Sequence, residues 1–182
     1  KTQQRTLGIG TIVHKLAEDW LKGLKVIEPE NEIVANCFKK FKDFWTSNKL
    51  KLLESEKLLY SEKGFCGTLD IVATDKSKNL ILIDIKTSNG IFHNYVLQLH
   101  AYKYLYEEQT GKKINKLCIV RLPKNDDDFE SRIFAYQPQH TKAFLGLLDC
   151  YKSLALYNDQ LKKFNANKKK ENANAKPIRK KK

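Results

Sequence analysis

The sequence lacks any apolar run long enough to cross a membrane. Its uninterrupted apolar stretches, such as Leu80–Ile83, reach only four residues, whereas a membrane-spanning helix needs about 20. It also lacks closely spaced cysteines, since those at positions 37, 66, 118 and 150 lie at least 29 residues apart. That spacing excludes the common zinc and iron–sulfur motifs. Each cysteine has apolar neighbours, so we expect four buried, reduced thiols in an intracellular protein, cytoplasmic if the source is bacterial or viral.

Arginine is scarce, although positive charge is abundant. Only four of the 34 basic residues are Arg, and with 21 acidic residues the net charge is +13. Such an excess is typical of proteins that bind a polyanion. Lys contacts phosphates as a point charge, whereas Arg is the preferred reader of guanine edges, so the composition favours sequence-independent binding of nucleic acid. Codon bias in an AT-rich genome would produce the same lysine excess.

The basic residues are concentrated at the C-terminal end. Residues 166–182 contain eight basic side chains and one acidic side chain. We therefore expect a single domain over residues 1–164 and a flexible basic tail over residues 165–182, which has too few apolar residues to fold by itself. One hypothesis is that the tail holds nucleic-acid phosphates. An inert solvated segment or a targeting signal fits the same composition.

The apolar periodicity predicts helices and strands in alternation. Apolar residues spaced three and four apart predict helices, and runs of β-branched residues between turn residues predict strands. The strand–helix–strand passage after residue 79 indicates a right-handed parallel crossover. The pattern predicts an α/β fold with a central mixed sheet flanked by helices. The expected helices are Gly8 to about Lys25, Pro29–Asn48, Ile91–Gln109 with Gly111 as C-cap, and Pro138–Phe164; the expected strands are Leu50–Tyr60, Gly64–Asp75, Asn79–Thr87, Ile114–Leu122 and Phe129–Tyr136.

Two acids face each other in the expected hairpin of residues 64–87. If its turn centres on Ser77, paired positions sum to 154 and Asp70 lies opposite Asp84, with Cβ atoms about 4.5–5.5 Å apart. Both have apolar neighbours, so the carboxylates would repel each other unless a proton or a divalent cation lies between them. Lys86 follows two residues later and projects from the same face as Asp84. Hard oxygen ligands of this kind suit Mg²⁺ or Mn²⁺. The alternative is a structural ion-pair cluster in which Lys86 neutralises both acids.

The motifs occur in a recognisable order. They are Gly10-Thr11-Ile12-Val13-His14, then Gly67-Thr68-Leu69-Asp70, then Asp84-Ile85-Lys86, and then Gln98-Leu99-His100-Ala101-Tyr102. This order over residues 8–122 resembles the PD-(D/E)XK nucleases, and within them the RecB-like branch, which includes CRISPR-adaptation and mitochondrial genome-maintenance exonucleases. The resemblance implies a restriction-endonuclease-like core. No cysteine set surrounds the motifs, so the implied variant has no iron–sulfur cluster.

The resemblance also implies a role for each motif residue. His14, Asp70, Asp84 and the backbone carbonyl of Ile85 would be metal ligands, and Asp70, Asp84 and Lys86 would be the catalytic set, with Lys86 orienting the attacking water. Gln98 and Tyr102 would line the substrate groove, although both could be ordinary packing residues of the helix.

The implied activity is a Mg²⁺- or Mn²⁺-dependent deoxyribonuclease, more readily an exonuclease on single strands or duplex ends than an endonuclease. Its implied partners are DNA and a larger replication, repair or recombination complex, with no membrane. The alternative is a non-catalytic nucleic-acid-binding module of the same fold. Glu18 is either a neighbour that supports the site or a solvated residue. His93, His100 and His140 have no evident partner and are expected at the surface.

Overall fold

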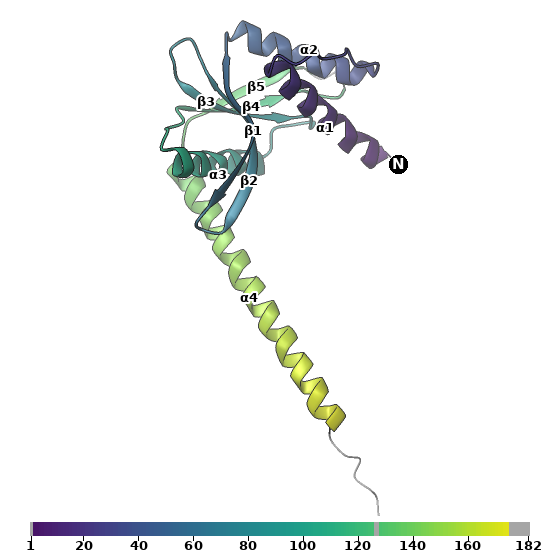
Figure 1. Cartoon of the computed structure of the whole chain (residues 1–182), viewed down its shortest axis with the longest axis vertical. Coiled ribbons are helices and arrows are strands. Elements are labelled where there is room, and N and C mark those ends of the chain that lie inside the picture. Colours follow the sequence, from purple (N-terminus) through teal and green to yellow (C-terminus); the bar gives the residue numbers. More distant parts are fainter. Residues whose placement is uncertain (1, 126–127, 175–182) are drawn as a thin grey trace, which may run out of the picture. The chain divides into compact units, whose positions relative to one another are not determined.

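The computed structural model describes the backbone of residues 2–125 and 128–174, and side chains within residues 8–125 and 128–170. None of the helices in these ranges is long and apolar enough to cross a membrane. Figure 1 shows the elements along the chain. They are α1 (Thr2–Leu21), α2 (Glu32–Ser47), β1 (Lys51–Ser61), β2 (Phe65–Thr74), β3 (Leu80–Lys86), α3 (His93–Thr110), β4 (Lys116–Arg121), β5 (Glu130–Phe134) and α4 (Pro138–Asn174).

The five strands form one mixed sheet in the order β1-β2-β3-β4-β5. Neighbouring strands are antiparallel except for β3 and β4, which are parallel. A parallel pair cannot be joined by a tight turn, and here α3 supplies the crossover between them. The predicted α/β fold class, a central mixed sheet flanked by helices, is confirmed.

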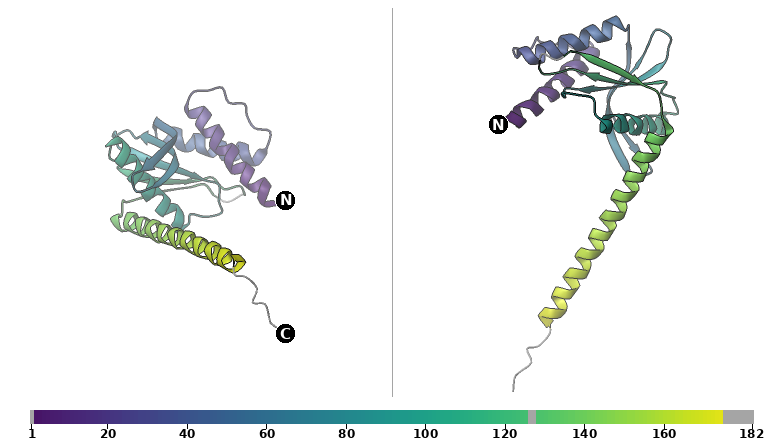
Figure 2. Two further views of the ribbon diagram at one scale, coloured as in Figure 1. Left: turned by 60° about the horizontal axis from the view of Figure 1, so that its bottom comes forward. Right: turned by 180° about the vertical axis from the view of Figure 1, so that it is seen from behind.

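Each face of the sheet is covered by helices (Figure 1, Figure 2). On one face, α1 and α2 pack against alternate residues of the strands, and on the other face α3 covers the residues in between. The side-chain period of two in a strand gives the sheet these two apolar faces. The first core includes Val13, Ala17, Phe41, Ile71, Ile83 and Ile85, and the second includes Val72, Leu82, Leu99 and Tyr106.

The two N-terminal helices differ from their predicted bounds at the caps. The side chain of Asn31 accepts a hydrogen bond from the Val34 N–H, so α2 begins at Glu32 rather than near Pro29. Helix α1 ends at Leu21 rather than near Lys25, because Gly23 has a φ of +72° and turns the chain. The helical spacing of apolar residues reaches as far as Leu24, but this side chain is 56% exposed and contributes little to the core.

Helix α4 begins at the predicted Pro138 and ends at Asn174, beyond the predicted end at Phe164. The added residues are mostly Lys, Asn and Ala, and the next proline comes only at position 177, so the sequence offers no strong helix breaker before then. Residues 175–182 of the expected tail lie outside the described residues, and the flexibility of the tail stays a prediction. By its internal contacts the chain divides into two units, Lys1–Thr141 and Lys142–Lys182. Within the second unit, several large apolar side chains of α4 are exposed, among them Leu147, Tyr151, Leu154, Leu156, Tyr157 and Phe164.

The prediction of four buried thiols is correct for Cys37 and Cys118 and wrong for Cys66 and Cys150, which are exposed. Burial raises the pKa of the Cys118 thiol to about 12. Cys66 lies opposite Tyr60 near the turn of the β1–β2 hairpin, where Tyr60 is also solvent-exposed. An apolar context in sequence therefore did not ensure burial.

The prediction that His100 lies at the surface is wrong, because its side chain is fully buried in α3. Its Nδ1 lies 2.8 Å from the Val96 carbonyl oxygen, and its Nε2 accepts a hydrogen bond of 3.1 Å from the Gln137 N–H. With both ring nitrogens paired the neutral imidazole can be buried, and burial lowers its pKa. His140 packs edge-on against this ring and is half-buried, contrary to the same prediction, whereas His93 is exposed as expected.

Candidate active site

The predicted register of the β2–β3 hairpin is confirmed. Ile71 lies opposite Ile83 and Val72 lies opposite Leu82, so paired positions sum to 154. The ladder stops at Ile71, one residue before Asp70. There the Asp70 side chain replaces the backbone as acceptor, because its Oδ2 accepts a hydrogen bond of 2.7 Å from the Ile85 N–H. Asp70 is therefore held on the backbone of the residue that follows Asp84, at the point where the two strands begin to diverge.

The turn of this hairpin is fixed by Asp75. Its Oδ1 accepts hydrogen bonds from the backbone N–H groups of Ser77 and Asn79, and its Oδ2 lies 2.7 Å from Lys116 Nζ. The hydrogen bond from Lys116, followed by that from Asn79, holds the pKa of Asp75 well below its usual range. Because a slip of one residue would turn every side chain to the opposite face, this turn determines that Asp70 meets Asp84.

Asp84 is a buried acid in an unfavourable position. Its side chain is 2% exposed, and burial, together with the charge of Asp70, raises its pKa to about 7. Lys86 Nζ lies 2.7 Å from Asp84 Oδ2, and this contact is an ion pair rather than a well-aligned hydrogen bond. A buried carboxylate whose charge is opposed by a second carboxylate is a donor set that suits a hard divalent cation.

Lys86 is held by a chain of contacts that ends at a glycine. Its ammonium group donates a hydrogen bond of 2.8 Å to Gln98 Oε1, and Gln98 Nε2 donates one of 3.0 Å to the Tyr102 hydroxyl. The Tyr102 ring lies over Gly67, where a Cβ atom would come within 2.7 Å of Cε1 of that ring. Gln98 and Tyr102, one turn apart on α3, thus orient Lys86, and Gly67 leaves room for them.

His14 reaches the two acids from α1. Its Nδ1 lies 3.6 Å from Asp70 Oδ2. Burial alone would lower the pKa of His14, but its interaction with Asp70 and the other nearby negative charges raise it overall. The close approach of α1 depends on Gly10, because a Cβ atom there would lie 2.9 Å from Thr87 Oγ1, just after β3. The helical spacing of four residues then places His14 over Asp70.

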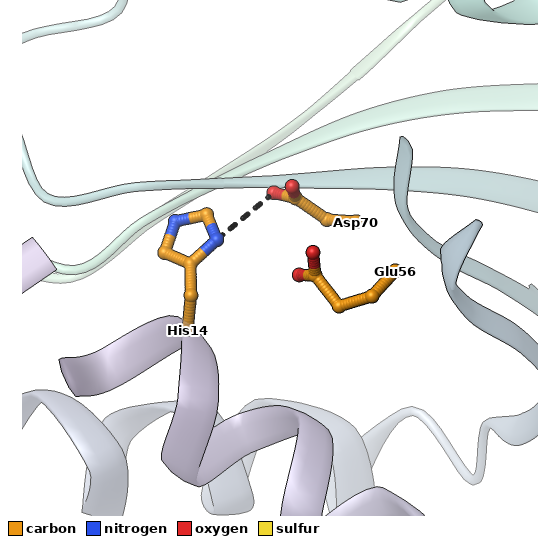
Figure 3. Close-up of side chains that lie close together, drawn as sticks. All are labelled: His14, Glu56 and Asp70. Carbon is orange, nitrogen blue, oxygen red and sulfur yellow. Dashed lines mark ion pairs between the residues drawn. The ribbon is translucent and has the colours of Figure 1, made fainter. Parts of the chain in front are cut away.

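Glu56 joins this group and was not predicted from the sequence. Ligand atoms of His14, Glu56 and Asp70 all lie within 4.8 Å of one another, and Figure 3 shows the three side chains converging from α1, β1 and β2. Glu56 has a φ of +48°, which is rare for a non-glycine residue and is a form of strain common at functional sites. Partial desolvation and the charge of Asp70 raise the pKa of its exposed carboxyl group.

The register of the β1–β2 hairpin, worked out from the sequence, would have placed Glu56 opposite Asp70. The strands β1 and β2 are joined by a turn in which the Gly64 N–H donates to the Ser61 carbonyl oxygen. Pairs near the site, such as Ser55 with Ile71 and Lys57 with Leu69, have positions that sum to 126. Position 56 therefore falls opposite position 70. The signal in the sequence that could have found Glu56 was Gly64, which marks a turn. A hairpin centred on the preceding residue, 63, pairs positions that sum to 126, as observed.

An open cavity of about 400 Å³ adjoins the three side chains. It is lined by Gly10, Thr11, His14, Lys15, Glu18 and Glu56. Glu18 forms ion pairs with Lys15 and Lys22 of its own helix, and the hydrogen bond from Lys22 is the main cause of its lowered pKa. The structure thus places Glu18 at the rim of the cavity, engaged by lysines rather than by the site residues.

The structure places the predicted site residues in two adjoining sets of contacts, which meet where Asp84 and Ile85 follow each other on β3. Asp70 contacts His14 and the backbone of Ile85, and Asp84 contacts Lys86, which contacts Gln98 and through it Tyr102. The alternative of one lysine neutralising both acids is not the arrangement found, because Lys86 pairs with Asp84 while Asp70 turns toward His14 and Ile85.

Comparisons with known proteins show only distant similarity. No protein-family model matches the chain, and no curated protein matches it. Similar solved structures include a candidate exonuclease from Eubacterium rectale (12% identity, 83% of this chain, TM-score 0.49), a repair endonuclease from Pyrococcus abyssi (18%, 53%, 0.34) and SSO0001 (14%, 80%, 0.42). The chain spans 66%, 40% and 85% of their respective lengths. At such identities, the geometry of the site has to carry the functional assignment.

Proposed function

We propose that this chain is a divalent-metal-dependent nuclease that hydrolyses phosphodiester bonds of DNA. The observation that carries the proposal is that Asp70 is held on the backbone next to Asp84 at the end of a hairpin, near enough for its charge to act on Asp84, beside a lysine anchored by Gln98. A structural ion pair needs neither the second acid nor the anchor. A metal-dependent phosphodiester hydrolase has a use for both, since the acids hold a cation and the lysine directs a positive charge at the phosphate.

The donor set fits a hard cation. Asp70, Asp84 and the Ile85 carbonyl would hold it, with His14 and Glu56 on the side of the cavity. Oxygen-rich sets of this kind favour Mg²⁺, and the imidazole adds affinity for Mn²⁺. A bound cation would supply electrophilic stabilisation of the negative charge on the phosphate and would make the attacking water more acidic.

The chain's own residues supply orientation and charge. Lys86, fixed through Gln98 and Tyr102, orients the attacking water and stabilises the negative charge that develops on the phosphate oxygens. Water attacks the phosphorus in line with the 3′ oxygen, and the bond between phosphorus and the 3′ oxygen breaks. The products are a 5′-phosphate and a 3′-hydroxyl. Neutralisation of Asp84 by a cation would also relieve the cost of burying its charge.

DNA is the proposed substrate because the chain carries a net charge of +13 with few arginines, a composition suited to phosphate contacts without base readout. We propose exonuclease action on single strands or duplex ends, in replication, repair or recombination, on the basis of the motif resemblance to the RecB-like branch.

The test is a nuclease assay on end-labelled single-stranded, duplex and circular DNA, with Mg²⁺, with Mn²⁺ or with EDTA. We expect cleavage of linear DNA only with a divalent cation, release of 5′-phosphate products and no cleavage by Asp84→Asn protein. Lys86→Ala should slow cleavage by orders of magnitude while DNA binding persists. Full activity in Asp84→Asn protein would falsify the proposal. DNA binding without cleavage under all metal conditions would favour a non-catalytic binding module instead.

A further inference from the structure

An exposed aromatic ring stands beside the catalytic lysine. Phe92 immediately precedes α3, and its side chain is 51% exposed. Its ring packs against Tyr95 at a centroid distance of 5.5 Å and an interplanar angle of 75°. Lys86 Nζ in turn lies over the Tyr95 ring, 4.9 Å from its centroid. The two rings therefore lead from the Lys86 ammonium group to solvent.

Tyr95 gives this arrangement a fixed base. It is partly buried and packs against the core on the α3 face of the sheet. The Lys86 ammonium group also lies over its ring in a cation–π contact. Phe92 rests on this anchored ring and presents much of its own surface to water. A rigid aromatic side chain of this kind loses little conformational entropy on binding a flat ligand.

The position of Phe92 is costly for the fold. It is the N-cap residue of α3, with extended backbone angles (φ −104°, ψ 156°) and no side-chain hydrogen bond to the first turn. Ser, Thr, Asp or Asn at this position would satisfy one of the free N–H groups of the helix, which a phenyl ring cannot do. An exposed phenyl ring in place of a capping residue contributes no cap and only partial burial, so its contribution to stability is limited to its contact with Tyr95.

We propose that Phe92, supported by Tyr95, stacks on an unpaired base of the nucleotide next to the scissile phosphate. The inference rests on the proposed nuclease function and assigns single-stranded nucleic acid as its preferred substrate. Aromatic rings bind single strands through the π-faces of unstacked bases, which every base has, so this contact is independent of sequence. Bases in a duplex are already stacked on their neighbours and do not offer that face.

The decisive variant is Phe92→Ser, because it separates binding from folding. Serine restores an N-cap, so the melting temperature should stay the same or rise. Cleavage of single-stranded DNA should fall roughly 5- to 150-fold, the range that corresponds to loss of one base-stacking contact. Cleavage from a duplex end should change much less. Phe92→Trp should restore activity on single strands, and Ile133→Ser, which alters another exposed apolar side chain on β5, should leave it unchanged.

Abasic substrates test the same contact by removing the base instead of the Phe92 ring. A set of oligonucleotides, each with one abasic nucleotide at a successive position, should include one or two that wild-type protein cleaves as slowly as Phe92→Ser protein cleaves intact DNA. On those same substrates Phe92→Ser should cause no further loss, because the contact has already been removed. The proposal would be overturned if Phe92→Ser lowered the cleavage rate equally on intact and abasic DNA, or if it left the rate on intact DNA unchanged.

Failure of the nuclease function would be distinguishable from failure of this inference. Asp84→Asn protein can be titrated with single strands that carry 2-aminopurine at each position in turn. Stacking on Phe92 should change the 2-aminopurine fluorescence at a defined position, and the change should disappear in Asp84→Asn/Phe92→Ser protein. An identical fluorescence profile in both proteins would exclude the stacking contact, whatever the outcome of the cleavage assays.

Discussion

A Cβ atom on Gly67 would lie 2.7 Å from Cε1 of Tyr102, so the tyrosine occupies space that only glycine leaves free on β2. Through its hydroxyl, Tyr102 holds Gln98, which holds Lys86. Gly67 on β2 thus leaves the space that lets Tyr102 and Gln98 orient the Lys86 ammonium group on the neighbouring strand β3. A steric requirement, the space taken by the Tyr102 ring, therefore explains why position 67 of the Gly67-Thr68-Leu69-Asp70 motif is glycine, and this requirement does not involve metal binding.

Gly67→Ala should therefore lower activity without unfolding the protein. The added methyl group forces the Tyr102 ring to move and displaces Lys86 through Gln98, and small displacements of catalytic groups can cost up to about 100-fold in rate. The measurement is kcat on single-stranded DNA together with thermal unfolding. Gly8→Ala is the control, since a Cβ atom there meets nothing within 4 Å. In a Tyr102→Ala background the Gly67→Ala loss should vanish, and an additive loss would contradict the steric link.

Gln98→Leu tests the anchor of Lys86 directly. Leucine keeps the packing volume but accepts no hydrogen bond, so Lys86 should lose its orientation and kcat should fall roughly 10- to 100-fold, the effect typical of residues that support a site. KM should change little, because Gln98 contacts Lys86 rather than a phosphate in this arrangement. If KM rises and kcat is unchanged, Gln98 lines the substrate groove instead.

Asp84→Asn should stabilise the protein when no metal is present. The substitution replaces a buried carboxylate, repelled by Asp70, with a neutral group of the same shape. Relief of this buried, repelled charge contributes about 1–3 kcal/mol, or roughly 2–12 °C in melting temperature for a domain of this size. In EDTA the variant should melt above the wild type, and saturating Mn²⁺ should narrow or reverse the difference by stabilising the wild type alone. A lower melting temperature for the variant in EDTA would count against a metal site at Asp84.

His14→Ala and Glu56→Gln should each raise the Mn²⁺ concentration needed for activity, by about tenfold or more if the side chain is a ligand. His14 and Glu56 share the cluster with Asp70, so both losses weaken the same site. The packing alternative for His14 predicts a lower melting temperature with and without Mn²⁺ and an unchanged metal requirement. Activity against Mn²⁺ concentration separates the two cases, and Lys15→Ala, at the rim of the cavity, is the control.

Asp75→Ala should lower stability in a pH-dependent way. The folded-state pKa of Asp75 lies below its unfolded value, because Lys116 and Asn79 donate to the carboxylate. Its contribution is therefore complete above the unfolded pKa of about 4 and is lost as the pH falls through the folded pKa. The variant should melt below the wild type at pH 7, and the two curves should converge as the pH falls below 4. A constant difference down to pH 2 would show that Asp75 stabilises the turn without its negative charge, and no difference at pH 7 would show that the backbone alone holds the turn.

Local sequence determined the elements and one of the two hairpin registers. Periodicities of 3.6 and 2 placed the helices and strands, and the turn around Ser77 was enough to set Asp70 beside Asp84, because strand pairing follows arithmetically from a tight turn. Glu56 was within reach of the same arithmetic through the turn at Gly64. Its positive φ, however, is a backbone conformation that composition does not encode.

Tertiary packing decided the remainder of the site. The contact between His14 and Asp70 depends on how closely α1 approaches β3, and that distance is set by Gly10 against Thr87 across 77 residues of chain. The burial of His100 likewise depends on Gln137, which supplies the second hydrogen bond from a distant segment. Periodicity reports which side of an element is apolar. It does not report which polar groups from other elements will meet there, since that depends on distances fixed only when the layers pack.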